Sequence, residues 1–221
     1  MRFRDRLDAA AQLARRLSKY HGMPGAVVAA IPRGGVVVGR ELARRLGLDF
    51  DIILAKKIGH PKSPEYAIGV VNLVSELIDE DIVARDGISR AYIESETARI
   101  RMELRKRYNL YRGNVRPAPL ADRVVIISDD GIATGNTMTA AVRAARREGA
   151  AKIIAAAPVC SQDAAAALRG IADEVVCVVE PEELFAIGNF YGDFDQVTDD
   201  EVVRLLGTAS LPSFNVESGS G

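Results

Sequence analysis

Short apolar runs alternate with amphipathic stretches along most of the chain. Residues 25–31 and 124–128 are apolar runs of strand length, and each leads through small residues into a helical pattern. Similar apolar runs occur at 151–160 and 173–181. Strands that alternate with helices predict βαβ units and a parallel sheet. The expected fold class is therefore α/β, with a central parallel sheet flanked by helices.

The region after the first βα unit is less regular. Residues 50–59 (FDIILAKKIG) predict a second strand that ends on the paired lysines Lys56 and Lys57. Residues 60–71 combine prolines, glycine and charge, which predicts a loop returning to a short strand. Residues 89–112 then predict a long charged helix with Ser89 as its N-cap.

Right-handed crossovers place the loops that follow parallel strands along one edge of the sheet. We expect that edge to gather the segments PRGG, KKIGHPK, SDDGIATGNT and VCSQD. We expect residues 1–206 to form a single domain, with about 181–206 as a small hood. Residues 207–221 are polar and rich in Gly and Ser, which predicts a disordered tail.

Composition excludes several classes of protein. The chain has 29 basic and 30 acidic residues, so no overall field directs it to DNA or to an anionic membrane. No apolar run reaches the roughly 20 residues of a membrane helix. Cys160 and Cys177 lie in or beside apolar runs without metal-ligand spacing, as expected for buried, reduced thiols. We therefore expect a cytoplasmic protein with no membrane or DNA partner.

Residues 124–137 (VVIISDDGIATGNT) carry the candidate chemistry. Small residues between a strand and a helix let backbone N–H groups curl around a phosphate at the helix N-terminus, and Thr134 and Thr137 add hydroxyl donors. The lysine of a Walker loop is missing, so nucleoside-triphosphate hydrolysis is not expected. Asp129 and Asp130 can accept hydrogen bonds from vicinal hydroxyls or help hold Mg²⁺. A pentose 5-phosphate fits both halves, whereas a simple N-cap would explain only one aspartate.

This stretch resembles the PRPP-binding signature of the type I phosphoribosyltransferases: four apolar residues, two acidic residues and a Thr-Gly turn before a helix. The order of elements supports the resemblance from about residue 3 to residue 200. It implies that Asp129 and Asp130 bind the ribose hydroxyls, with Mg²⁺ as cofactor. It also implies that the turn binds the 5-phosphate, through Ala133, Thr134, Gly135, Asn136 and Thr137.

The segment PRGG is the second candidate loop. Its glycines allow close approach of an anion, and Arg33 can form a bidentate phosphate contact. The glycine spacing does not match the G-x-G-x-x-G pattern of dinucleotide-binding proteins. In the family that the chain resembles, this position is the pyrophosphate loop, which implies that Arg33, Gly34 and Gly35 bind PRPP. We also expect a cis peptide bond between Pro32 and Arg33.

The paired lysines are further candidates for catalysis. The resemblance makes residues 59–69 a flexible loop that closes over PRPP, with one lysine neutralising the departing pyrophosphate. Side chains alternate along a strand, so only one of Lys56 and Lys57 is expected to point into the site. The sequence leaves open which one, and a solvated surface position is the alternative for either.

The acceptor is left open by conflicting signals. The segment FAIG followed by Asp193 resembles the hood of hypoxanthine/guanine phosphoribosyltransferases, although the spacing is one residue longer. The hypoxanthine/guanine enzymes usually carry a catalytic aspartate at the position of Ala133. The adenine and orotate types have alanine there, as this chain does. For the aromatic residues, packing of the C-terminal cap is the alternative to stacking on a base. The candidate acceptor-binding residues are Glu65, Tyr66, Phe185, Tyr191 and Asp193.

Two other functions compete with transfer from PRPP. A haloacid-dehalogenase-type phosphatase needs D-x-D-x-[TV] after an early strand, but residues 193–197 (DFDQV) follow no apolar strand. A PRPP-sensing regulator would bind PRPP without turnover, and it stays open as the alternative. The resemblance favours Mg²⁺-dependent transfer of 5-phosphoribosyl from PRPP to a nitrogenous base, with release of pyrophosphate. The resemblance to this family also implies a homodimer.

Overall fold

The computed structural model describes residues 2–113 and 117–207, without the side chain of Glu65. Its centre is a five-stranded parallel sheet in the order β2-β1-β6-β7-β8, which confirms the expected α/β class. The strands are β1 (Ala26–Ala30), β2 (Asp49–Ile52), β6 (Val124–Ser128), β7 (Lys152–Val159) and β8 (Glu174–Val179).

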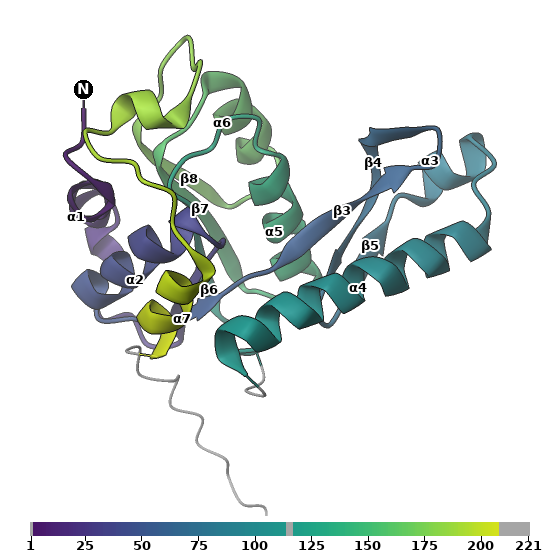
Figure 1. Cartoon of the computed structure of the whole chain (residues 1–221), viewed down its shortest axis with the longest axis horizontal. Coiled ribbons are helices and arrows are strands. Elements are labelled where there is room, and N and C mark those ends of the chain that lie inside the picture. The colour runs from purple at the N-terminus through teal and green to yellow at the C-terminus, as the bar shows by residue number, and fades with distance from the viewer. Residues whose placement is uncertain (1, 114–116, 208–221) are drawn as a thin grey trace, which may run out of the picture.

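Helices cover both faces of this sheet (Figure 1). Val28 and Ala30 of β1 pack in one apolar cluster, and Val27 and Ala29 pack in the cluster on the opposite face. Because both faces are buried, the strands are continuous apolar runs. One face is covered by α1 (Arg6–Arg16), α2 (Gly34–Leu46) and α7 (Asp199–Gly207), and the other by α5 (Asn136–Arg147) and α6 (Gln162–Arg169).

Residues 55–112 form an arm that extends away from the central sheet (Figure 1). It contains a three-stranded antiparallel sheet in the order β3-β4-β5, together with two helices. The elements are β3 (Ala55–His60), β4 (Ser63–Asn72), β5 (Glu76–Ile78), α3 (Glu80–Arg85) and α4 (Arg90–Arg112).

The arm corrects two expectations. Residues 50–59 do not form one strand, because β2 ends at Ile52 and β3 begins at Ala55 in the other sheet. Residues 60–71 are not mainly a loop, since β3 and β4 form a hairpin. The segment KKIGHPK consequently lies in the arm and not in a loop at the edge of the central sheet.

The long helix α4 joins the arm to the central sheet. Ser89 caps it as expected, because its hydroxyl accepts a hydrogen bond from the Tyr92 N–H at 3.3 Å. Near its C-terminal end, the Tyr111 hydroxyl donates to Asp199 Oδ1 at 2.6 Å. Arg112 forms a buried ion pair with Asp51 at 3.1 Å. At the C-terminal end of α4, polar contacts to β2 and α7 therefore add to the packing of its apolar face.

The N-terminal residues and the segment after β8 lie side by side. Phe3 and Tyr191 form a parallel bridge and share an apolar cluster. This segment contains a short 3₁₀ helix, η2 (Ile187–Phe190), and a second one, η1 (Ser18–Tyr20), follows α1. We propose that residues 1–206 form one domain with about 181–206 as the hood. Of the predicted tail at 207–221, Gly207 is the last residue of α7, and residues 208–221 lie outside the described residues.

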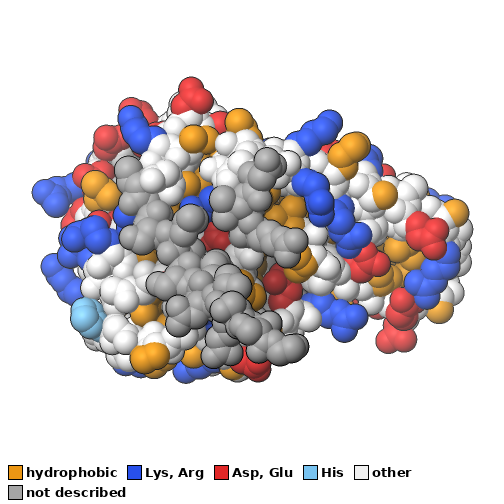
Figure 2. Space-filling model, turned by 90° about the horizontal axis from the view of Figure 1, so that it is seen from below, with side chains coloured by type: hydrophobic (Ala, Val, Ile, Leu, Met, Phe, Trp, Pro, Cys, Tyr) orange, Lys and Arg blue, Asp and Glu red, His pale blue; other side chains and the backbone are white. Residues whose placement is uncertain are grey.

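Two properties of the described residues agree with the composition. Figure 2 shows basic and acidic side chains interspersed over the visible face, without a broad field of one sign. Among the helices of residues 2–113 and 117–207, none is long and apolar enough to cross a membrane.

Candidate functional site

Two of the candidate loops touch at the carboxyl ends of β1 and β6. A Cβ added to Gly34 would lie 1.8 Å from Asp130 Oδ2, and one added to Gly35 would lie 2.9 Å from Asp129 Cα. The PRGG backbone therefore approaches the acid pair more closely than residues with side chains would allow. The peptide bond between Pro32 and Arg33 is cis, which confirms that prediction.

A third loop supports the turn after the acid pair. Ile132 forms a bridge with Cys160, and its N–H donates to the Val159 carbonyl at 2.8 Å. The Ser161 hydroxyl donates to the Ala133 carbonyl at 2.6 Å. The end of β7 thus fixes the turn, so PRGG, SDDGIATGNT and VCSQD meet at one edge as expected.

The turn opens the N-terminus of α5 towards solvent. Gly135 is the N-cap residue with φ of 76°, a left-handed conformation that favours glycine. The first intrahelical bond runs from the Thr139 N–H to the Gly135 carbonyl at 2.8 Å. The N–H groups of Asn136, Thr137 and Met138 precede it and need other partners. This is the geometry of a helix N-terminus that can hold an anion.

The acid pair is held by its own backbone and by two distant side chains. Asp129 Oδ1 accepts a hydrogen bond from the Asp130 N–H at 2.8 Å. Asp130 Oδ2 accepts from Arg6 Nε at 2.9 Å, and the Asp130 carbonyl accepts from the Tyr191 hydroxyl at 2.6 Å. Burial raises the pKa of Asp129 well above its usual range, and the neighbouring charge of Asp130 adds to the effect.

Arg6 was not among the residues predicted from the sequence. Its guanidinium lies 3.9 Å from the centre of the Phe194 ring and donates to the Asp195 carbonyl at 2.9 Å. Arg6 is one of several arginines in the first 16 residues, and nothing in the local pattern distinguishes it. Its importance comes from contacts more than 120 residues away in the chain.

The candidate acceptor residues of the hood have different environments. Tyr191 is buried, with Phe194 stacked on its ring at 4.6 Å and Phe3 at 5.4 Å. This placement does not favour stacking of a base on Tyr191. Phe185 is 87% exposed, and Asp193 is exposed and accepts a hydrogen bond from the Asp195 N–H at 3.2 Å.

The candidate acceptor residues of the arm, Glu65 and Tyr66, both lie in β4. Tyr66 is 44% exposed and contacts His60 and Arg85, both within the arm. These contacts do not bring it to the acid pair. Glu65 lies in β4, and its side chain is outside the described residues.

The two lysines point to opposite faces of the arm. Lys56 Nζ forms an ion pair with Glu103 of α4 at 2.8 Å. Lys57 lies opposite Val70 in the antiparallel register, and Val70 packs against Ala140 of α5. Directly opposed residues share a face of the sheet, so Lys57 is on the α5 side. The lysines lie within β3 and do not end a strand of the central sheet, which corrects the expected position.

The acid pair has the donor chemistry for Mg²⁺. This ion commonly takes one or two carboxylates together with substrate phosphates. Asp129 and Asp130 offer neighbouring carboxylates. Burial is the first cause of the raised pKa of Asp129, and the charge of Asp130, which adds to it, is one that a cation would offset. In residues 2–113 and 117–207, no group of three or more His, Cys, Asp or Glu side chains is placed to hold a metal ion.

Cys160 and Cys177 are buried free thiols, as predicted.

The comparison with protein families defines the class. A family model for the phosphoribosyl transferase domain matches residues 3–188, and the chain belongs to this family. The acid pair and its turn lie within the matched range.

Individual relatives agree with this assignment. Two Mycobacterium tuberculosis proteins, MT0597 and Rv0571c, are each 39% identical over 208 residues, and their names class them provisionally as phosphoribosyl transferases. The match covers 94% of this chain and 47% of each relative, so the chain spans about half their length. The crystal structure of TT1426 from Thermus thermophilus is also similar to this chain. The two sequences are 41% identical, and the structures match with a TM-score of 0.85 over 93% of this chain and 98% of that one.

Proposed function

We propose that this chain is a Mg²⁺-dependent phosphoribosyltransferase, which transfers 5-phosphoribosyl from PRPP to a nitrogenous base or another nitrogen acceptor. The observation that carries the proposal is the contact of the PRGG loop with Asp129 and Asp130 beside the open N-terminus of α5. Phosphate, ribose and pyrophosphate would each meet suitable groups within this one arrangement.

The 5-phosphate would bind at the start of α5. Backbone N–H groups that precede the first intrahelical bond would donate to it, together with the exposed side chains of Thr134 and Thr137. This contact lies away from the reacting carbon, so its binding energy would serve to position the sugar. Ala133, Gly135 and Asn136 complete the proposed phosphate-binding turn.

The ribose hydroxyls would face Asp129 and Asp130. Mg²⁺, held by these carboxylates and by oxygens of PRPP, would supply positive charge to the pyrophosphate. Arg33, Gly34 and Gly35 would bind the pyrophosphate, since Arg33 is an exposed N-cap residue of α2 and the two glycines after it lie against the acid pair. Negative charge at the acid pair would also stabilise an oxocarbenium-like sugar during transfer.

The reaction balances as a substitution at C1 of the ribose. The acceptor nitrogen forms a bond to C1, the C1–O bond to pyrophosphate breaks, and its electron pair leaves with pyrophosphate. The nitrogen then loses a proton to solvent. Lys57, on the α5 side of the arm, would offset charge on the leaving group if the arm closes over the site.

The acceptor would approach from the hood. Phe185 is the favoured stacking residue because its ring is exposed, with Asp193 as a polar contact. Glu65, Tyr66 and Tyr191 stay secondary candidates. We also propose a homodimer and a cytoplasmic location, in keeping with the family resemblance.

The test is incubation of the purified chain with PRPP, Mg²⁺ and a panel of purines, pyrimidines and small amines. Release of pyrophosphate and a ribosylated product identified by mass are expected with at least one acceptor. The Asp130→Asn variant should remain folded and lose PRPP affinity or turnover by about tenfold or more, as for a charge-assisted hydrogen bond. Calorimetric PRPP binding without turnover on any acceptor would favour the sensing alternative.

A further inference from the structure

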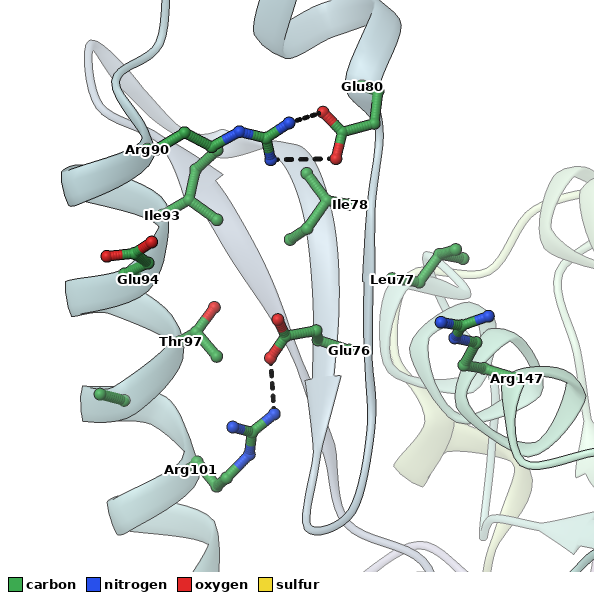
Figure 3. A pocket seen from close by; sticks show the side chains of 11 residues that line it. Glu76, Leu77, Ile78, Glu80, Arg90, Ile93, Glu94, Thr97, Arg101 and Arg147 are labelled. Carbon is green, nitrogen blue, oxygen red and sulfur yellow. Dashed lines mark hydrogen bonds and ion pairs between the residues drawn. The ribbon is translucent and has the colours of Figure 1, made fainter.

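A cavity in the arm is separate from the acid pair. It has a volume of about 580 Å³, which is a usual size for a small-molecule site. Figure 3 shows α4 along one wall, β5 facing it, and Arg147 of α5 beyond β5. The side chains that carry the argument are Glu76, Ile78, Ile93, Thr97, Arg101 and Arg147.

Two polar groups on α4 lack partners at this cavity. Thr97 is 5% exposed, and Figure 3 shows its side chain directed from α4 towards β5. Within the described part of the chain, Thr97 Oγ1 and Arg101 Nε are buried and have no hydrogen-bond partner. These residues are one helical turn apart, so their side chains share a face of α4. Unpaired buried polar atoms are uncommon and costly, which points to an additional partner.

The charges of the cavity favour a neutral molecule. Three arginines and three glutamates line it, so their formal charges cancel. Arg90 and Glu80 form a two-bond ion pair, and Arg101 donates to Glu76 at 2.6 Å through its terminal nitrogen (Figure 3). The remaining Nε–H of Arg101 is a donor that requires an acceptor.

The apolar lining adds a requirement for shape. Ile93 is buried, and Ile78 is partly buried on the facing strand. Such side chains bind the flat face of a ring, whereas Thr97 can both donate and accept a hydrogen bond. A fitting ligand therefore combines a flat apolar body with a carbonyl and an adjacent N–H.

We propose that the arm cavity binds a neutral lactam heterocycle of nucleobase size, at a site distinct from the one that would hold PRPP. The ligand carbonyl accepts from Arg101 Nε–H, and its ring N–H donates to Thr97 Oγ1. The ring lies between Ile78 and Ile93, and Arg147 also lines the cavity. This binding site does not depend on the proposed transfer reaction.

The test uses the full chain with labelled isoleucine methyl groups. Uracil and hypoxanthine are titrated while the methyl signals of Ile78 and Ile93 are followed by NMR. Saturable shifts at these two methyls are expected with at least one of the bases, and 1,3-dimethyluracil, which has no N–H, should bind more weakly. The absence of shifts at millimolar concentration of both bases would overturn the proposal.

Matched variants assign the contacts. Thr97→Val keeps the shape and removes the hydroxyl, so affinity should fall about tenfold, whereas Thr97→Ser should retain it. Arg101→Lys keeps the charge but lacks Nε–H, and it should also weaken binding. An unchanged affinity in Thr97→Val would refute the assignment, with thermal unfolding used to verify that each variant is folded.

A final control separates this site from the proposed active site. Asp130→Asn should leave the shifts of Ile78 and Ile93 unchanged while it weakens PRPP binding measured by calorimetry. If the base shifts disappear in Asp130→Asn, the bases bind at the acid pair and the arm proposal fails. If PRPP does not bind to the wild-type chain, the proposed transferase fails while the arm site is still judged by its own titration.

Discussion

Arg6 Nε lies 2.9 Å from Asp130 Oδ2, which ties the first helix to the acid pair. The two side chains are only 11% and 17% exposed, so this ion pair is largely shielded from solvent. The Arg6 guanidinium also lies against Phe194 of the hood. One arginine therefore connects α1, the acid pair and the hood.

Replacement of Arg6 by methionine should destabilise the protein and weaken PRPP binding. Loss of the arginine leaves the Asp130 carboxylate partly buried without its ion partner. We expect the free energy of unfolding to fall by about 2 kcal/mol, which corresponds to a decrease in Tm of about 4–8 °C for a chain of this size. Thermal unfolding and PRPP calorimetry measure the two effects.

Two controls distinguish this effect from a general loss of charge. Arg16→Met removes an exposed arginine from the same helix and should change stability by less than about 0.5 kcal/mol. In a double-mutant cycle, Arg6→Met and Asp130→Asn should show a coupling energy of about 1–2 kcal/mol. If the losses of stability in the two single variants are additive in the double variant, a direct interaction between the two residues is contradicted.

A side chain added at Gly34 should impair PRPP binding more than folding. The Cβ of Gly34→Ala would overlap Asp130 Oδ2, at 1.8 Å, and Asp130 would have to rotate away from Arg6. We expect PRPP affinity to fall about tenfold or more, as for loss of an oriented charged contact.

The control is Gly207→Ala at the end of α7, where an added Cβ has no heavy atom within 4 Å. This variant should bind PRPP like the wild type. Normal affinity in Gly34→Ala, measured by calorimetry, would show that the position of Asp130 is not required.

The fold was largely predictable where local pattern and tertiary structure agree. The parallel strands and Ser89 at the start of α4 follow from apolar runs and capping chemistry. The break between β2 and β3 was not predictable, because Ile52, Ile53 and Leu54 continue the apolar run while the chain changes sheets. An apolar run shows that a strand is buried but does not show which sheet it joins.

The lysine pair offers a direct comparison of two adjacent residues. Lys56→Ala removes an exposed ion pair to Glu103 on the α4 side, and such pairs contribute little. Lys57→Ala changes the α5 side of the arm and should lower kcat by about tenfold or more, as expected for loss of charge stabilisation in transfer. Steady-state kinetics with the acceptor found in the panel measures both; equal kcat values would contradict the assignment.

The site was predictable only as far as short motifs reach. Asp129, Asp130 and the turn after them are contiguous, so their spacing carries chemical information. Arg6 and Phe194 reach the same place from opposite ends of the chain, and no sequence spacing links them. Exposure of Phe185 and burial of Tyr191 likewise depend on how the hood folds back against Phe3.

Glu148 should make stability depend on pH. It lies at the end of α5 and accepts a hydrogen bond from the Asn72 side chain. Burial raises the pKa of Glu148 above its ordinary value of 4.5. The folded protein then holds this proton more tightly than the unfolded chain. Stability is therefore lost as pH rises from about 4.5 through the raised pKa, and the loss is complete above it.

The Glu148→Gln variant keeps an acceptor for Asn72 and removes the buried charge. We expect it to be more stable than the wild type at pH 8, with the difference decreasing as the pH falls towards 4.5. Urea unfolding across this range measures the difference. Glu182→Gln, at an exposed position after β8, should show no such trend. A Glu148→Gln difference that is constant with pH would exclude titration of Glu148 as its cause.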